Sequence, residues 1–346
     1  MAWLRRLLVA GGFLAALAVA GAVLMWRLED HDLGHRQSEA FSVATPDGRL
    51  AGSLWLPDGP PRAAVALVHG DGPQDRTASG GYAQLINTLL DAGLAVVAWD
   101  KPGTGGSAGN WLDQSMDDRA AETRAALAAL RRRIAPVPVG ALGFSQAGWV
   151  LPKLRQEDAA FLVLAGPAVS WQDQGRYYTR TRLERQGMAP DRIEAELDRL
   201  AREDDRLFGP AHVDPAALPD GLDPDRRAFI RRNRTADATD DLRRLRLPLL
   251  ALWGANDLNV DAAGAARVYR DTAAGNHPAN RIVTVPGATH GLLKADRYNT
   301  QLVSQWPWYT LGAFLLEGRR AYAPGTLDTI LDWILARAEA RASSDG

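Results

Sequence analysis

The segment VPVGALGFSQAG, residues 137–148, decides the fold of this chain. Its first part, residues 137–144, is a short apolar run of strand length, and it leads directly into Ser145 and a helix-compatible stretch, residues 149–154. A serine on a tight turn from strand to helix exposes its hydroxyl above the edge of a sheet. The pattern therefore predicts a nucleophile at Ser145, and the N-terminus of the following helix would favour negative charge there.

Similar apolar runs before and after this segment predict a parallel sheet. They cover residues 64–68, 94–99, 161–165, 247–253 and 281–285. Helical patterns separate several of these runs, such as the stretch from Tyr82 to Ala92 and an alanine-rich stretch that follows a capping-box pattern at Ser115 and Asp118. Runs that are apolar on both faces and alternate with helices are typical of a parallel sheet covered on both sides. The predicted fold class is α/β, with a hairpin around Pro46-Asp47-Gly48 leading into a mostly parallel central sheet.

The strand pattern stops at about residue 169 and resumes at about residue 246. Between these positions charge is dense, and Ile193, Leu197 and Leu200 mark an amphipathic helix. The sequence therefore predicts a helical insertion within one large domain. The predicted parts are an N-terminal hydrophobic segment, a first half of the core, a helical cap insertion and a second half of the core, at residues 1–30, 31–168, 169–245 and 246–346.

The N-terminus has the pattern of a membrane anchor. Arg5 and Arg6 precede an apolar run from Leu7 to Trp26 that is long enough to cross a hydrocarbon core as a transmembrane helix. Because basic residues stay inside, this signal-anchor would place the bulk of the chain on the extracytoplasmic side of the cytoplasmic (inner) membrane. The alternative is a cleaved signal peptide, since Ala18-Val19-Ala20 resembles a cleavage site, and the protein would then be secreted or periplasmic.

The amino-acid composition excludes several classes of function. The 346 residues carry a net charge of -1, so no electrostatic attraction to nucleic acid is expected. The absence of cysteine excludes thiol nucleophiles, thiolate metal sites and disulfides. No metal-ligand cluster is visible, and we expect neither a metal nor a cofactor. Gly103, Gly105 and Ala108 fit a loose dinucleotide-binding spacing, but no helix pattern begins within them, which argues against a nucleotide site.

An acid and a base follow two other predicted strands. A serine hydroxyl needs a histidine base that is oriented by a carboxylate. Asp257 follows the strand at 247–253, and His290 follows the strand at 281–285, so both belong to the sheet edge where α/β proteins bind ligands. The predicted catalytic residues are Ser145, Asp257 and His290, with Asp261 as the alternative acid.

The loops after two further predicted strands, at residues 64–68 and 94–99, also have predicted roles. Acyl transfer needs N–H donors for the oxygen anion of its intermediate. The backbone N–H of Gln146, directly after the nucleophile, is one predicted donor, and that of Asp71, in the loop after the strand at 64–68, is the other. An ordinary glycine turn is the alternative for that loop. Asp100 follows the strand at 94–99, and we expect it to brace the glycine-rich turn at 103–109.

From about Phe41 to its end, the chain resembles the α/β-hydrolase superfamily, and within it the bacterial EstD-like serine esterases. The resemblance is carried by HGDGPQDR at residues 69–76, DKPGTGGS at residues 100–107 and GFSQAGW at residues 143–149. It implies a serine carboxylesterase with a helical cap, no cofactor, and a triad of Ser145, Asp257 and His290, whose chain order is that of the superfamily.

Three positions depart from the pattern of that family. Ala147 stands where glycine is usual, Asp71 where serine is common and Pro102 where arginine is frequent. The methyl group of Ala147 would crowd the turn at the nucleophile. The carboxylate of Asp71 would oppose an oxygen anion if it pointed inward.

These features predict hydrolysis of a small-molecule carboxylic ester through an acyl-enzyme. A serine peptidase or thioesterase of the same fold is an alternative, since the chemistry is shared. A second alternative is a catalytically silent, membrane-tethered binding module. An aromatic cluster follows His290 and has three possible interpretations: it packs in the core, it lines an acyl pocket, or it lies at the membrane surface. The cluster comprises Tyr298, Trp306, Trp308, Tyr309 and Phe314.

Overall fold

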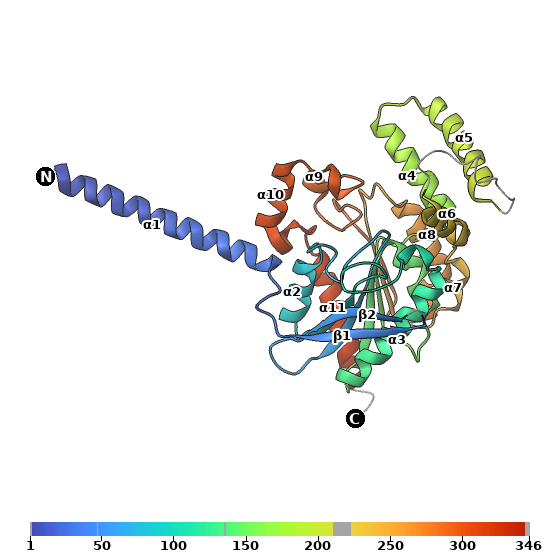
Figure 1. Cartoon of the computed structure of the whole chain (residues 1–346), viewed down its shortest axis with the longest axis horizontal. Coiled ribbons are helices and arrows are strands. Elements are labelled where there is room, and N and C mark those ends of the chain that lie inside the picture. Colours follow the sequence, from blue (N-terminus) through green and yellow to red (C-terminus); the bar gives the residue numbers. More distant parts are fainter. Residues whose placement is uncertain (1, 47, 135, 210–222, 343–346) are drawn as a thin grey trace.

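The computed structural model describes residues 2–46, 48–134, 136–209 and 223–342, which form an eight-stranded sheet flanked by helices (Figure 1). The strand order is β1-β2-β4-β3-β5-β6-β7-β8. Strands β3 to β8 are parallel, and the β1–β2 hairpin is antiparallel. The predicted α/β class and mostly parallel sheet are confirmed. The strands are β1 Ser38–Thr45, β2 Gly48–Trp55, β3 Ala63–Val68, β4 Leu94–Trp99, β5 Val139–Phe144, β6 Leu162–Ala165, β7 Leu249–Gly254 and β8 Arg281–Val285.

The helices connect these strands and cover both faces of the sheet (Figure 1). Ser115 and Asp118 exchange hydrogen bonds at the start of α3, so the predicted capping box is confirmed. The α-helices are α1 Ala2–Leu28, α2 Ala83–Asp91, α3 Met116–Ile134, α4 Trp171–Arg185, α5 Pro190–Phe208, α6 Pro224–Asn233, α7 Thr239–Arg244, α8 Ala262–Thr272, α9 Ala295–Tyr298, α10 Trp308–Glu317 and α11 Thr326–Ala342.

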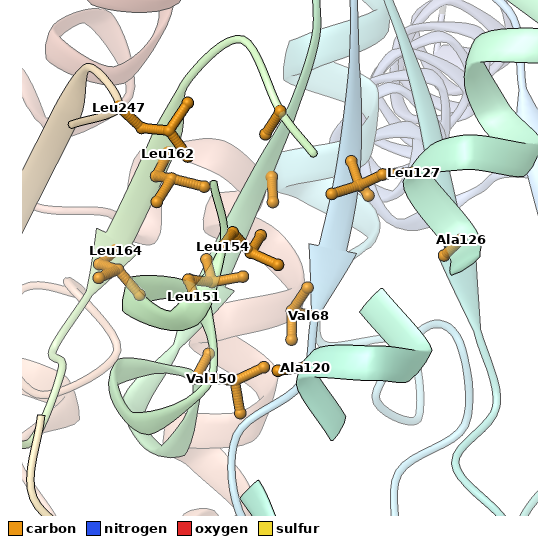
Figure 2. Packing of buried hydrophobic residues seen from close by; sticks show 14 of the residues in the cluster. Val68, Ala120, Ala126, Leu127, Val150, Leu151, Leu154, Leu162, Leu164 and Leu247 are labelled. Carbon is orange, nitrogen blue, oxygen red and sulfur yellow. The ribbon is translucent and has the colours of Figure 1, made fainter. Parts of the chain in front are cut away.

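The core lies on both faces of the sheet, as the unbroken apolar strands require. Successive side chains of a strand point to opposite faces. Val68 of β3 therefore packs with Leu127 of α3 and Leu151, on the face shown in Figure 2. Its neighbour Leu67 packs on the other face with Ile86 of α2 and other apolar residues of α2 and α11. Apolar residues therefore pack on both faces of the sheet, and the loops at the carboxyl ends of the strands remain available to form a site.

The prediction of a helix at residues 149–154 is wrong. Two short 3-10 turns, η3 Ser145–Trp149 and η4 Leu151–Lys153, follow β5 instead. Pro152 has no N–H to continue a helix. Gly148 also packs tightly, since a Cβ there would lie 2.6 Å from the carbonyl oxygen of Ala168. No long helix therefore begins behind Ser145, so the helix N-terminus that was expected to favour negative charge there is absent.

The N-terminal segment forms a single helix, α1, which extends away from the body of the molecule (Figure 1). Among the helices that the structure describes, none combines the length and apolar character needed to span a membrane. The predicted signal-anchor is therefore not supported. The predicted extracytoplasmic location stays a prediction.

The described part of the segment between β6 and β7 consists mainly of helices. Its described residues contain α4 to α7, and α4 packs on α5 through Leu183, Ile193 and Leu197 (Figure 1). Residues 210–222 of the predicted cap lie outside the described part of the chain. We call residues 169–245 the inserted segment. Its role as a cap, and the division of the chain into four parts, stay predictions.

The aromatic cluster after His290 divides between core and surface. Tyr298 is buried, and its ring contacts those of Trp306 and Phe314. Trp308 and Tyr309, at the start of α10, are 84% and 62% exposed. Of this cluster only Tyr298 is buried, whereas Trp306 and Phe314 are half-buried against it.

Candidate active site

Ser145 lies at the junction of β5 and η3 with a backbone φ of +50°, in the left-handed region that non-glycine residues seldom adopt. The close packing of this turn depends on Gly143, because a Cβ there would lie 2.5 Å from the Cβ of Ala147. The methyl group of Ala147 thus occupies space that Gly143 leaves open. Crowding by Ala147, which the sequence suggested, is absorbed in this way.

Asp257 and His290 form a direct pair at the ends of β7 and β8. Asp257 is buried, and its Oδ1 accepts the N–H groups of Asn259 at 2.7 Å and Val260 at 2.9 Å. Its Oδ2 lies 2.7 Å from His290 Nδ1. A carboxylate only accepts hydrogen bonds, so Nδ1 carries the proton and Nε2 is left as a base.

The alternative acid Asp261 has another role. Its side chain accepts the N–H of Gly264 at 3.0 Å and caps helix α8. The carboxylate that the structure pairs with His290 is therefore Asp257.

His290 packs over the end of β6, the strand next to that of Ser145. A Cβ at Gly166, which follows β6, would lie 2.9 Å from the imidazole ring of His290. Within the described residues, His290 and the Ser145 hydroxyl share no hydrogen bond. The structure thus joins Asp257 to His290 and places Ser145 at a neighbouring strand end. Catalytic hydrogen bonds are often long before substrate binds.

The pKa of His290 determines the pH at which it can act as a base. Burial lowers this pKa, but the charge of Asp257 and the hydrogen bond to it more than offset burial, so the pKa is raised above its ordinary value of 6.5. A base works only when unprotonated. If His290 is the base of the hydrolysis that the sequence predicts, we expect kcat/KM to fall with decreasing pH through an apparent pKa above 6.5. A pH profile of kcat/KM measures this, and a limb at or below 6.5 would contradict the role of Asp257.

The loop after β3 lies against the nucleophile. A Cβ at Gly70 would be 3.4 Å from the Cβ of Ser145. In the described part of the chain, the backbone N–H groups of Asp71 and Gln146 make no hydrogen bond, so both are free to bind an oxygen anion. The Asp71 carboxylate accepts Gln146 Nε2 at 2.9 Å, and its other oxygen lies 3.5 Å from Arg226 of α6. The charge of Asp71 is thus held by partners of its own.

The other polar residues after β3 and β4 support the backbone. His69 Nε2 donates to the carbonyl oxygen of Trp99 at 2.7 Å, and burial, followed by the charge of Lys101, lowers the pKa of His69 to about 3. His69 is therefore neutral at physiological pH. Asp100 accepts the N–H of Gly106 at 2.7 Å and the guanidinium of Arg76 at 2.6 Å. The predicted role of Asp100 as a brace of the glycine-rich turn is confirmed.

Three residues near this site were missed by the sequence reasoning. Lys101 and Arg119 are buried cations that bind the loop after β3, and Tyr177 of α4 donates its hydroxyl to the carbonyl oxygen of Asp257 at 2.8 Å. Burial, and secondly the charge of Arg119, hold the pKa of Lys101 well below its ordinary value. The sequence did carry a signal for Lys101, because this residue closely follows β4 at the sheet edge where α/β proteins bind ligands. Arg119 and Tyr177 are helix residues without one.

Among the described residues, no three His, Asp or Glu side chains are grouped so that they would hold an ion. The chemistry available at this edge is that of a serine, an imidazole, a carboxylate and backbone N–H groups.

Comparisons with known proteins bear on the fold of the chain. A family model described as serine aminopeptidase, S33, matches residues 59–208. An esterase of Pyrococcus furiosus superposes with a TM-score of 0.54 at 15% identity, covering 83% of this chain and 92% of that one. A thermophilic esterase of Thermogutta terrifontis gives a TM-score of 0.50 at 18% identity, covering 87% of this chain and 99% of that one. At these identities the solved structures establish the fold alone.

Proposed function

The chain has the α/β-hydrolase fold, and from this premise we propose that it is a serine hydrolase that cleaves carboxylic esters. The observation that carries the proposal is the pairing of His290 with the buried Asp257 at 2.7 Å, at the same sheet edge as a serine in a left-handed turn. An imidazole that is paired in this way is suited to take a proton from a hydroxyl.

The proposed reaction has two halves. Ser145 Oγ attacks the ester carbonyl while His290 Nε2 takes its proton, and the Asp257 carboxylate stabilises the imidazolium that forms. The N–H groups of Asp71 and Gln146 bind the oxygen anion. The C–O bond to the alcohol then breaks, the alcohol leaves with the proton from His290, and water hydrolyses the acyl-enzyme by the same steps.

We also propose that the inserted segment is a cap over this site. Two contacts support the proposal: Tyr177 of α4 bonds to the Asp257 carbonyl at 2.8 Å, and Arg226 of α6 lies 3.5 Å from the Asp71 carboxylate. Each links a helix of the inserted segment to a loop of the site. Such contacts would let the segment shape the space for the acyl and alcohol groups.

The test of the function is a pair of measurements on the purified full chain. A fluorophosphonate probe is expected to label one serine per chain, and peptide mapping is expected to find the label on Ser145. p-Nitrophenyl acetate and butyrate are expected to give a burst of nitrophenol equal to the enzyme concentration whenever deacylation is slow. Absence of both labelling and turnover would reject the serine hydrolase, and it would favour the silent binding module instead.

A peptidase is the second candidate, because the matching family model is described as a serine aminopeptidase. The two reactions share the nucleophile and differ in the leaving group. Comparing kcat/KM for an ester, a thioester and an aminoacyl p-nitroanilide with the same acyl chain separates them. We expect the ester to be fastest, and a faster anilide would make the chain a peptidase.

A further inference from the structure

Two buried cations lie against the loop that follows β3. Lys101 is 1% exposed and Arg119 is 3% exposed. The Nζ of Lys101 donates to the carbonyl oxygens of Gly70 at 2.6 Å and Gly72 at 2.9 Å. Arg119 Nη2 donates to the carbonyl oxygen of His69 at 2.6 Å. Three carbonyl groups of this short loop are thus held by the side chains of Lys101 and Arg119.

Lys101 makes an unusual set of contacts for a buried lysine. Burying an ammonium group is costly unless it is well hydrogen-bonded, and a carboxylate is the usual partner. In the part of the chain that the structure describes, Lys101 has no carboxylate partner, and its bonds go to the two backbone carbonyls. The ring of Trp111, with its centroid 5.2 Å from Nζ, covers another side of the ammonium. The polar contacts of Lys101 are therefore with the loop.

The bond to Gly70 fixes the direction of a proposed oxyanion donor. A trans peptide is planar, and its C=O and N–H point in opposite directions. The carbonyl of Gly70 belongs to the same peptide as the N–H of Asp71. Lys101 therefore holds one end of this peptide and directs the Asp71 N–H away from itself. The same glycine lies against the nucleophile, with 3.4 Å between a Cβ at Gly70 and the Cβ of Ser145.

We propose that Lys101 is a positioning residue for the oxyanion hole, which holds the Gly70–Asp71 peptide so that its N–H stays directed at the anion formed at Ser145. The inference rests on the proposed ester hydrolysis. A charged donor on a carbonyl also polarises the peptide and strengthens its N–H as a donor. Both the ammonium and the neutral amine of Lys101 have enough N–H groups for the two bonds, so the restraint on the peptide persists in either state.

The first test compares two substitutions of the same kind. Lys101→Met keeps an unbranched side chain and removes the donors. Loss of an oxyanion donor lowers kcat by about 10²–10³-fold, and we expect a fall of that order with KM changed by less than about threefold. Lys153→Met is the control, since Lys153 pairs with Asp117 and Asp241 on the surface, and it is expected to stay within about twofold of wild type.

A transition-state analogue separates positioning from a general loss of structure. An alkyl trifluoromethyl ketone forms a hemiketal with the serine, and its oxygen anion needs the same donors as the reaction. We expect the Ki of this ketone to rise in Lys101→Met by the factor by which kcat/KM falls. A variant with unchanged Ki and unchanged kcat, and with a wild-type melting temperature, would overturn the proposal.

Amide hydrogen exchange tests the same role without any turnover. The peptide covering residues 69–76 is expected to exchange faster in Lys101→Met than in wild type and in Lys153→Met. Should Lys101→Met fail to fold, Lys101→Gln, which keeps N–H donors, takes its place, with a smaller rise expected. If the wild-type chain proves inactive on esters while Lys101→Met still exchanges faster than wild type, the ester hydrolase is rejected and the restraint of this loop by Lys101 is kept. Unchanged exchange in a folded variant rejects that role.

Discussion

Replacing Ser145 by alanine is expected to lower kcat for p-nitrophenyl butyrate by about 10⁶-fold, the size of effect seen when a triad serine is removed. The substitution deletes the oxygen that the proposed mechanism uses as the nucleophile of the acylation half. The small activity that remains would come from substrate binding and the oxyanion donors, which stay in place. Fluorophosphonate labelling is expected to disappear together with turnover.

Ser79→Ala is a matched control for this substitution. Ser79 also has a left-handed backbone, with φ of +55° against +50° for Ser145, so the two variants place the same residue in the same strained conformation. Ser79 lies in the exposed loop before α2 and has no part in the proposed chemistry. Its variant is expected to keep kcat within about twofold of wild type. Equal losses in both variants would mean that strain, rather than the nucleophile, explains the result.

Asp257→Asn is expected to lower kcat by about 10⁴-fold, because it leaves His290 in the wrong tautomer. The loop decides which atom of the new amide faces the imidazole. The Oδ1 position accepts two backbone N–H groups, from Asn259 and Val260, so the amide oxygen must stay there. The amide NH₂ then takes the place of Oδ2, which lies 2.7 Å from His290 Nδ1. A donor at this point moves the histidine proton to Nε2, where it blocks acceptance of the Ser145 proton.

The measurement is kcat for the variant beside that of Asp261→Asn. Asp261 was the alternative acid, and its carboxylate caps α8 through the N–H of Gly264. An asparagine caps a helix about as well as an aspartate, so this control is expected to fold and to keep its activity within about twofold. Similar losses in both variants, or the larger loss at position 261, would contradict the assignment of Asp257.

Much of the sheet was predictable because its signals are local. A strand buried on both faces must be apolar throughout, and β3, β4, β5 and β7 were found within two residues of their observed ends. The loops that hold Ser145 and Asp257 were found for the same reason, since each follows such a strand at the edge where parallel strands end. His290 follows β8, which is only partly buried, and its loop was found because it comes after a strand-like segment. The helix expected after Ser145 failed, because Pro152 and tight packing at Gly148 outweigh the apolar pattern there.

The sequence by itself determined the class of fold, the sheet edge that carries the site and the three side chains proposed for the chemistry. These follow from the length and polarity of short segments, and both depend only on residues close together in the sequence. Only the tertiary structure decided that Asp257, and not Asp261, bonds to His290, and that Asp71 is held by Gln146 and Arg226. The tertiary structure also brought Lys101 to the loop after β3. Such contacts join residues far apart in the chain, and their partners are set by the packing of whole elements rather than by any pattern along one of them.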